Sequence, residues 1–394
     1  QSASRMGVRA QPFRPSRTMR ASLKSRACLA ANTSPVSLEN MRKNSSTYPV
    51  EIVSDAFGES PALANLLSGA SRVFIVADMN VVQRNESLGT QIGHYVQTHG
   101  INLAGTPVVI SGGEKVKSDN LQSVLKIVSA LLEAKLGKND IVLAIGGGTI
   151  LDITGYAAAQ VRGGTRLVRM PTTPTAMLGA AFADYAAINL ASVKDALRVP
   201  SVPSAIVIDP TLAKTVLDGV WRSGMGEAVR VAVGSDAALL KKLERLRADY
   251  AARREGALDG VVEAVVASRM KKSVSDIALW AAHRLESMSG YKQPYGYSVS
   301  IATLMEASVA QEMNVISEAD GLRVFELLRS AGALDGLSHA QYLLQQTDSL
   351  LCGLDAWLLS SSEGVPMLTA LGKSDCTLIP DREQYRAAMK RIRA

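Results

Sequence analysis

A short apolar run followed at once by three glycines constrains the fold of this 394-residue chain more than any other feature. Residues 141–145 read Ile-Val-Leu-Ala-Ile, residues 146–148 are glycines, and an apolar helical pattern continues to about residue 160. This order predicts a buried strand that turns directly into a helix. Glycines there let the backbone approach a phosphate, which the first N–H groups of the helix face. A purely structural turn is the alternative, because the spacing is not G-x-G-x-x-G.

The chain around this turn alternates between strand and helix patterns. A helical pattern at 120–136 separates two apolar runs, and similar runs recur up to residue 208. Such alternation predicts an open, mostly parallel α/β sheet over residues 50–210. The expected strands, besides 141–145, are residues 73–77, 107–110, 167–170 and 205–208.

Strand signals stop near residue 211, and long helical patterns follow. We expect helices at 236–254, 258–284, 298–313 and 318–331. The length also suits two domains better than one. We therefore predict an α/β domain over residues 46–210 and a mainly helical domain over residues 211–394, with the active cleft between them.

The net charge of +7 comes from the first 45 residues, which hold nine Lys or Arg and one acid, Glu39. Residues 46–394 carry 34 bases and 35 acids, so the charge gives no support for nucleic-acid binding. An Arg-rich, Ser-rich and acid-poor arm is typical of an organelle transit peptide. We predict a transit peptide over residues 1–45, for a plastid rather than a mitochondrion; a solvated basic tail is the alternative.

No apolar run is long enough for a membrane-spanning helix, so we expect no membrane span. The three cysteines are too few and too scattered for a disulfide framework, which favours a reducing compartment.

Polar residues follow several of the expected strands and should gather at one sheet edge. Asp78 and Asn80 come after the first strand, where a carboxylate commonly accepts hydrogen bonds from ribose hydroxyls. A Gly-Glu-Lys-Val-Lys segment at 113–117 follows the second strand, and Thr172 and Thr173 follow a later one. Each could be an ordinary turn. Together with the glycine turn they predict a dinucleotide site.

This ordered series resembles the 3-dehydroquinate synthase family and, more broadly, the sugar-phosphate cyclases. The likeness extends from about residue 50 to 380, including Gly-x-Gly-Glu-Ala at 224–228. It implies an NAD-binding α/β domain, a helical domain and a homodimer. It also implies cyclisation of a phosphorylated sugar acid by phosphate elimination, with a zinc ion as Lewis acid. The cofactor residues implied by the resemblance are Asp78, Asn80, Glu114, Lys117, Gly147, Gly148, Asp152, Thr172 and Thr173.

The cofactor half of the family pattern is complete, whereas the metal half is not. Glu227 matches the zinc glutamate, but the two zinc histidines fall on Leu279 and Tyr295. His283 matches the family's proton-handling histidine, with a packed core histidine as its alternative. A zinc site normally needs three protein ligands, so we do not expect normal zinc binding.

The substrate-binding cations are also fewer. Lys194 is retained, and Arg230 replaces a family lysine. Arg230 keeps the charge but cannot shuttle a proton. If chemistry survives, His283, Lys194 and Arg230 are the expected catalytic residues, with Glu227 at the metal position.

Four functions remain open at this point. The first is an NAD-binding relative of 3-dehydroquinate synthase without normal zinc-dependent cyclisation, which serves as a regulatory or assembly subunit. The second is an active 3-dehydroquinate synthase or related cyclase, a phosphate-eliminating lyase of the shikimate pathway. A metal-dependent polyol dehydrogenase fits Glu227 and His283 poorly. The last is a structural subunit of an organellar complex that binds nothing small.

Overall fold

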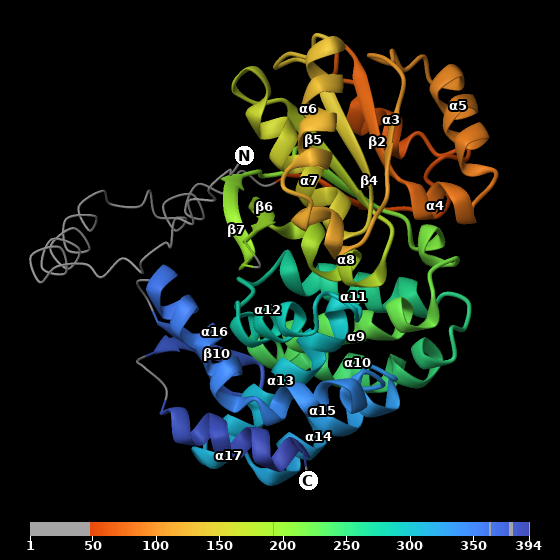
Figure 1. The fold of residues 1–394 in the computed structure, drawn as a ribbon. Coiled ribbons are helices and arrows are strands. Elements are labelled where there is room, and N and C mark those ends of the chain that lie inside the picture. The colour runs from red at the N-terminus through yellow and green to blue at the C-terminus, as the bar shows by residue number, and fades with distance from the viewer. Residues whose placement is uncertain (1–47, 192, 362–363, 378–380, 394) are drawn as a thin grey trace, which may run out of the picture. The chain divides into compact units, whose positions relative to one another are not determined.

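Six parallel strands form the central sheet, in the order β1-β8-β5-β4-β2-β3 (Figure 1). The computed structural model describes residues 48–394, apart from 192, 362–363, 378–380 and 394. The predicted transit peptide, residues 1–45, lies outside the described residues. The strands are β1 (Val50–Ile52), β2 (Val73–Asp78), β3 (Val108–Ile110), β4 (Ile141–Gly146), β5 (Arg166–Pro171) and β8 (Ala205–Ile208).

The two central strands read as continuous apolar runs because both faces of the sheet are covered. Every residue of β2 and β4 is buried. Alternate residues of β2 face two separate cores: Phe74 and Val76 join one, and Val73, Ile75 and Ala77 join the other. The core containing Phe74 also includes α6 (Gln122–Glu133) and α7 (Gly148–Gln160), and the other includes α3 (Ala62–Leu67) and α5 (Leu88–Thr98).

An antiparallel hairpin that the sequence did not predict lies beside the sheet. It consists of β6 (Tyr185–Leu190) and β7 (Val193–Pro200), and β6 packs against α7. The strand β7 reads Val-Lys-Asp-Ala-Leu-Arg-Val-Pro, which mixes charged and apolar residues and gives no clear apolar run. The hairpin brings Lys194 next to Glu114, which follows the edge strand β3.

The rest of the chain is mainly helical, as predicted, with two corrections. The expected helix at 258–284 is wrong as a single element, because α11 and α12 are separate helices with Ala278 in a left-handed conformation between them (φ 67°). A short antiparallel pair, β9 (Val365–Ala370) and β10 (Lys373–Thr377), also lies in this region. The helices are α9 (Asp218–Ser235), α10 (Ala237–Ala251), α11 (Ala257–Arg269), α12 (Leu279–Met288), α13 (Tyr295–Glu312), α14 (Glu318–Ser330), α15 (Leu337–Gln345), α16 (Thr347–Ser360) and α17 (Arg382–Arg393).

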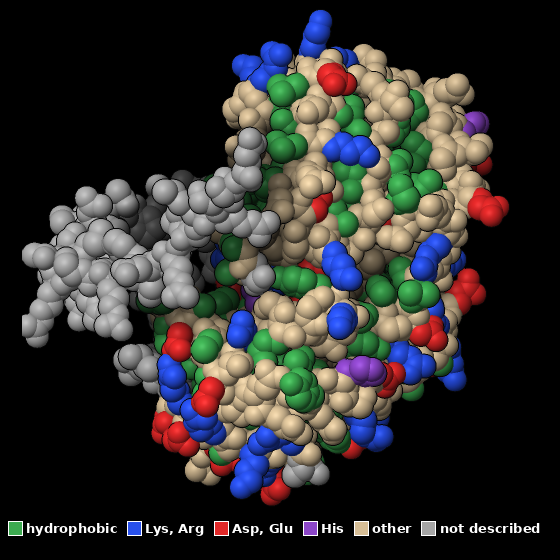
Figure 2. Space-filling view, in the orientation of Figure 1, with side chains coloured by type: hydrophobic (Ala, Val, Ile, Leu, Met, Phe, Trp, Pro, Cys, Tyr) green, Lys and Arg blue, Asp and Glu red, His purple; other side chains and the backbone are tan. Residues whose placement is uncertain are grey.

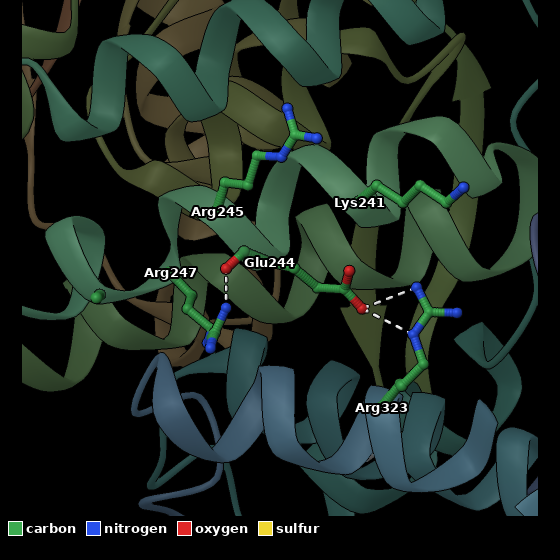
Figure 3. A pocket seen from close by; sticks show the side chains of 6 residues that line it. Lys241, Glu244, Arg245, Arg247 and Arg323 are labelled. Carbon is green, nitrogen blue, oxygen red and sulfur yellow. Dashed lines mark hydrogen bonds and ion pairs between the residues drawn. The ribbon is translucent and has the colours of Figure 1, made fainter. Parts of the chain in front are cut away.

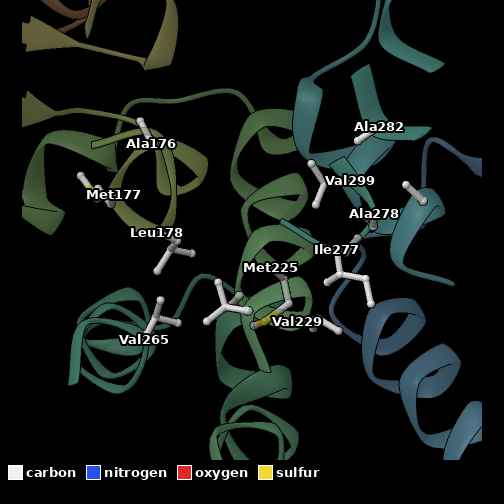
Figure 4. Close-up of a cluster of buried hydrophobic side chains, with 14 of the residues drawn as sticks. Ala176, Met177, Leu178, Met225, Val229, Val265, Ile277, Ala278, Ala282 and Val299 are labelled. Carbon is white, nitrogen blue, oxygen red and sulfur yellow. The ribbon is translucent and has the colours of Figure 1, made fainter. Parts of the chain in front are cut away.

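An apolar cluster joins the sheet layer to the helices. Helix α8 (Pro174–Leu178) follows β5 and packs against α9. Figure 4 shows Met177 and Leu178 of α8 beside Met225 of α9, Val265 of α11 and Val299 of α13, all buried. Burial of these side chains holds α8 and α9 in fixed contact. No helix among the described residues is long and apolar enough to cross a membrane.

Candidate cofactor and catalytic site

Asp78 ends β2 and organises the neighbouring loops. Its Oδ1 accepts hydrogen bonds from the backbone N–H of Asn80 at 2.9 Å, from Asn80 Nδ2 at 3.0 Å and from the N–H of Gly112 at 3.2 Å. A Cβ on Gly112 would lie 2.2 Å from Asp78 Oδ2, so only glycine fits against this carboxylate. Asp78, whose carboxylate was predicted to contact a ribose, and Asn80 are therefore adjacent and fixed at the carboxyl ends of the strands.

The glycine turn begins α7 as the sequence predicted. Gly147 is extended and its carbonyl accepts the first bonds of the helix, from Ile150 and Leu151. The first N–H groups of a helix have no partner within it and attract an anion. Thr172, which follows β5, donates its backbone N–H to Gly146, while its hydroxyl is buried and has no hydrogen-bond partner in the described part of the chain. Next to it, Thr173 caps α8.

Lys117 lies in the 3₁₀ helix η2 (Glu114–Ser118) and is almost completely buried. Its ammonium contacts Asp152 Oδ2 of α7 at 2.7 Å and Asp195 Oδ1 of β7 at 2.8 Å. Burial disfavours the charged ammonium, but Asp152 and Asp195 outweigh it and raise the pKa of Lys117. Asp195 has a left-handed backbone (φ 52°), which is strained for a residue with a Cβ.

Lys194 is held between two carboxylates from different parts of the fold. Its ammonium lies 2.6 Å from Glu114 Oε1 and 2.7 Å from Glu286 Oε2 of α12. Glu114 also accepts hydrogen bonds from Asn189 Nδ2 at 3.0 Å and from Thr149 Oγ1 at 3.3 Å. The lysine therefore joins the sheet layer to the helical layer.

The two glutamates beside Lys194 have opposite protonation tendencies. Burial would raise the pKa of Glu114, but Lys117 and Lys194 outweigh it and lower that pKa to about 2. Burial raises the pKa of Glu286 to about 7 in spite of Lys194. The Lys194 ammonium thus contacts Glu114, which stays ionised, and Glu286, whose carboxyl group can hold a proton near neutral pH.

His283 lies one helical turn before Glu286 and is mostly buried, with 16% of its side chain exposed. Its Nε2 is 3.9 Å from Asp195 Oδ2, and its ring centroid is 5.9 Å from that of Tyr295. Lys194 Nζ lies 5.0 Å from the Tyr295 ring centroid. Burial outweighs the attraction of Asp195 and lowers the pKa of His283 to about 3, so the imidazole is neutral at physiological pH.

Glu227 of α9, the residue at the expected metal position, is engaged by two arginines. Arg230 Nε donates to Oε2 at 2.9 Å and Arg230 Nη2 donates to Oε1 at 2.8 Å. Arg269 Nη2 also donates to Oε1, at 2.9 Å. No group of three His, Cys, Asp or Glu side chains within the described ranges is arranged to hold a metal ion. The donors present do not fit a zinc ion, which needs three protein ligands.

The expected residues thus fall into three groups. Asp78, Asn80, Gly147, Gly148, Thr172 and Thr173 lie at the carboxyl edge of β2, β4 and β5, and Glu114, Lys117, Asp152, Lys194 and His283 form one network. Glu227 and Arg230 form a separate cluster. Sequence reasoning missed Asp195, Glu286 and Arg269. Asp195 follows Lys194 directly and Glu286 lies three residues after His283, so their closeness to predicted site residues could have identified both. Arg269 is not close in sequence to any predicted site residue.

Neither of two hollows on the surface of the helical part belongs to this site. One, of about 680 Å³, lies between α10 and α14. Figure 3 shows Arg323 paired with Glu244 there, with Lys241, Arg245 and Arg247 around them. The other, of about 400 Å³, lies near residues 311–318. On the face seen in Figure 2, basic and acidic side chains are interspersed over the helical half.

Comparisons with known proteins identify relatives of this chain in sequence and in fold. A family model described as 3-dehydroquinate synthase N-terminal matches residues 107–223. The 3-dehydroquinate synthase of Picosynechococcus sp. is 28% identical over 305 residues, which cover 73% of this chain and 80% of that protein.

Two solved structures share the fold. The 2-epi-5-epi-valiolone synthase ValA of Streptomyces hygroscopicus, with NAD⁺ and Zn²⁺ bound, has a TM-score of 0.74 at 21% identity. It covers 88% of this chain and 96% of its own. A 2-deoxy-scyllo-inosose synthase, complexed with carbaglucose-6-phosphate, NAD⁺ and Co²⁺, has a TM-score of 0.69 at 17% identity, covering 87% and 96%. The predicted fold class, a parallel α/β layer with a helical C-terminal part, is confirmed.

Proposed function

The chain is related to the 3-dehydroquinate synthase family in sequence and in fold, and we propose that it binds NAD without performing normal zinc-dependent cyclisation. In this proposal it acts as a regulatory or assembly subunit. The observation that carries the cofactor assignment is the glycine turn, in which the buried strand β4 passes directly into α7 at Gly147 and Gly148. The first N–H groups of α7 have no partner within the helix, and a phosphate oxygen at this turn would accept hydrogen bonds from them.

The cofactor residues divide into those that touch NAD and those that position them. Gly147 and Gly148 would hold the pyrophosphate, because the first N–H groups of α7 are available there and the absence of side chains permits close approach. Asp78 accepts hydrogen bonds from ribose hydroxyls with its remaining lone pairs. Lys117 forms an ion pair with Asp152 in the first turns of α7. It therefore contributes to NAD binding by fixing the N-terminal end of this helix. Bound NAD supplies a hydride acceptor at this edge of the sheet.

The alternative is an active 3-dehydroquinate synthase or related sugar-phosphate cyclase. The relatives carry synthase names, and one neighbour is complexed with a phosphorylated carbasugar. Lys194 and His283 lie within one network here, as proton-handling groups of such an enzyme would. In this alternative Lys194 binds an anionic group of the substrate, the neutral His283 accepts a proton at Nε2, and Arg230 is held away by Glu227.

The cellular and assembly parts of the proposal rest on sequence and resemblance. We propose import into a plastid, from the composition of residues 1–45, and assembly as a homodimer or within a larger organellar complex.

Cofactor titration with matched variants tests the proposal. NAD⁺ should bind to the purified full chain, and Asp78→Asn should weaken the affinity about tenfold by weakening a hydrogen bond to the ribose. Asp348→Asn, at a mostly exposed carboxylate of α16, is the control and should bind like wild type. Absence of NAD⁺ binding to the wild-type chain would refute the proposal. Formation of dehydroquinate from a seven-carbon sugar phosphate would instead establish the alternative.

A further inference from the structure

We infer that Glu227, Arg230 and Arg269 form a permanent buried ion-pair cluster that occupies the expected metal position and makes this fold independent of zinc. The inference concerns what has replaced the metal, and it rests on the proposed function only for its statement about NAD affinity. Three observations support it. The Glu227 carboxylate is fully hydrogen-bonded, the guanidinium groups of Arg230 and Arg269 have further fixed partners, and the charges of the cluster do not favour a cation.

The carboxylate of Glu227 has little capacity left for a metal ion. Arg230 binds both of its oxygens through two nitrogens, and Arg269 adds a second bond to Oε1. Such bidentate guanidinium–carboxylate pairs combine favourable charge with matched geometry. Gly179 closes another side, because a Cβ there would lie 2.7 Å from Glu227 Oε1. The three hydrogen bonds and the close approach of Gly179 together enclose the carboxylate.

The two guanidinium groups are fixed independently of the carboxylate. Arg230 Nη1 donates to the carbonyl of Ser275 at 2.5 Å. Arg269 Nε donates to the carbonyl of Leu178 at 2.8 Å, and its guanidinium carbon lies 5.0 Å from the Phe182 ring centroid. Neither arginine can turn away to make room for a cation without losing these partners. The cluster therefore connects α8, α9, α11 and the segment before α12.

The cluster also has no excess negative charge to attract a dication. Glu227 and the two guanidinium groups sum to +1, and the neighbouring Asp276, which acts on both arginines, brings the sum to about zero, in a position where Glu227 and Arg230 are both about 4% exposed. The neighbouring position that the resemblance assigns to a zinc histidine is Leu279, whose side chain has no ligating atom.

The same contacts give Glu227 a structural role. Its removal would take from Arg230 and Arg269 the carboxylate that is hydrogen-bonded to both, which is strongly unfavourable for buried guanidinium groups. A residual metal ligand without this role could be neutralised with little effect on stability. The stability of Glu227→Gln therefore distinguishes a Glu227 that is the centre of an ion-pair cluster from one that is a retained metal ligand.

Zinc content and thermal unfolding of the full chain test the inference. We expect less than about 0.1 zinc per chain after purification, and a midpoint of thermal unfolding that EDTA does not change. Glu227→Gln should lower that midpoint by at least about 5 °C, because it takes from two buried guanidinium groups the carboxylate that is hydrogen-bonded to both. Glu263→Gln, at an exposed glutamate of α11, is the matched control and should unfold like wild type.

The opposite pattern would overturn the inference. Zinc bound one per chain, lost in Glu227→Gln, with a wild-type midpoint that falls on chelation, would identify Glu227 as a metal ligand. The wild-type zinc content and EDTA response decide the matter even if Glu227→Gln fails to fold. NAD⁺ affinity should be the same in EDTA and in excess Zn²⁺; if NAD⁺ does not bind at all, the proposed function fails while the metal measurements still judge this inference.

Discussion

Glu306 offers a sharp test of the structure, because its carboxyl group is buried in the helical part among neutral partners. Trp280 Nε1 donates to Oε1 at 2.9 Å, and the Tyr385 hydroxyl lies 3.1 Å from both oxygens. The three residues come from α12, α13 and α17. Burial outweighs these hydrogen bonds and raises the pKa of Glu306 from 4.5 to about 7.

The sign of the effect follows from proton binding. Between pH 4.5 and 7 the folded chain keeps a proton on Glu306 that the unfolded chain has lost, so this group makes the protein less stable as pH rises. With about 1.4 kcal/mol for each unit of pKa difference, the free energy of unfolding should fall by about 2 kcal/mol between pH 5 and pH 8 because of this group.

Glu306→Gln should remove this fall in the free energy of unfolding between pH 5 and pH 8. Glutamine imitates the protonated acid, since its carbonyl accepts from Trp280 and its amide faces a hydroxyl that can accept. Guanidinium chloride unfolding at pH 5, 6.5 and 8 should show the variant gaining on wild type by about 2 kcal/mol over this range. Glu286, whose pKa is also raised to about 7, contributes equally to both chains and cancels in the difference.

Exposed Glu263→Gln serves as the control, with a difference from wild type that stays constant with pH. A constant difference for Glu306→Gln as well would refute the buried, protonated carboxyl. So would a variant that is destabilised equally at pH 5 and pH 8.

Three further predictions concern the cofactor and network residues. Gly112→Ala should weaken NAD⁺ binding about tenfold in a fluorescence titration, because its Cβ would displace Asp78; unchanged affinity would contradict that role. The His283 imidazole should show no titration between pH 5 and 8 by NMR, as its pKa of about 3 requires, and a midpoint above pH 6 would contradict its burial. Asp195→Asn should destabilise the chain by about 2 kcal/mol at pH 7 in denaturant unfolding, since Lys117 loses a buried partner; a change below 0.5 kcal/mol, about the effect of a surface substitution, would contradict the ion pair.

Elements with a strong local signal could be predicted from the sequence. The runs at 73–77 and 141–145 are strands because a parallel strand covered on both faces must be apolar throughout. The glycine turn identified the start of α7 for a similar reason, since a strand that enters a helix directly leaves little room for side chains. The polar residues after β2 and β5 could be grouped because the carboxyl ends of parallel strands share an edge.

Features that depend on distant contacts could not be predicted. The hairpin β6–β7 is stabilised by pairing of its own strands and by α7, and its mixed sequence gives no period of two. Residues 258–284 give one long apolar helical pattern in the sequence, but the structure divides this segment into α11 and α12. Arg269 lies 42 residues from Glu227 in the sequence, so nothing local could indicate that the expected metal ligand is paired with it.

One calorimetric experiment tests the central claim most directly: titration of the purified full chain with NAD⁺, once in EDTA and once with excess Zn²⁺. The structure predicts one NAD⁺ per chain with the same affinity in both conditions, because the glycine turn is complete and Glu227 is occupied by arginines. Affinity that rises on adding zinc would contradict the metal-independent site. Absence of NAD⁺ binding in both conditions would contradict the cofactor assignment itself.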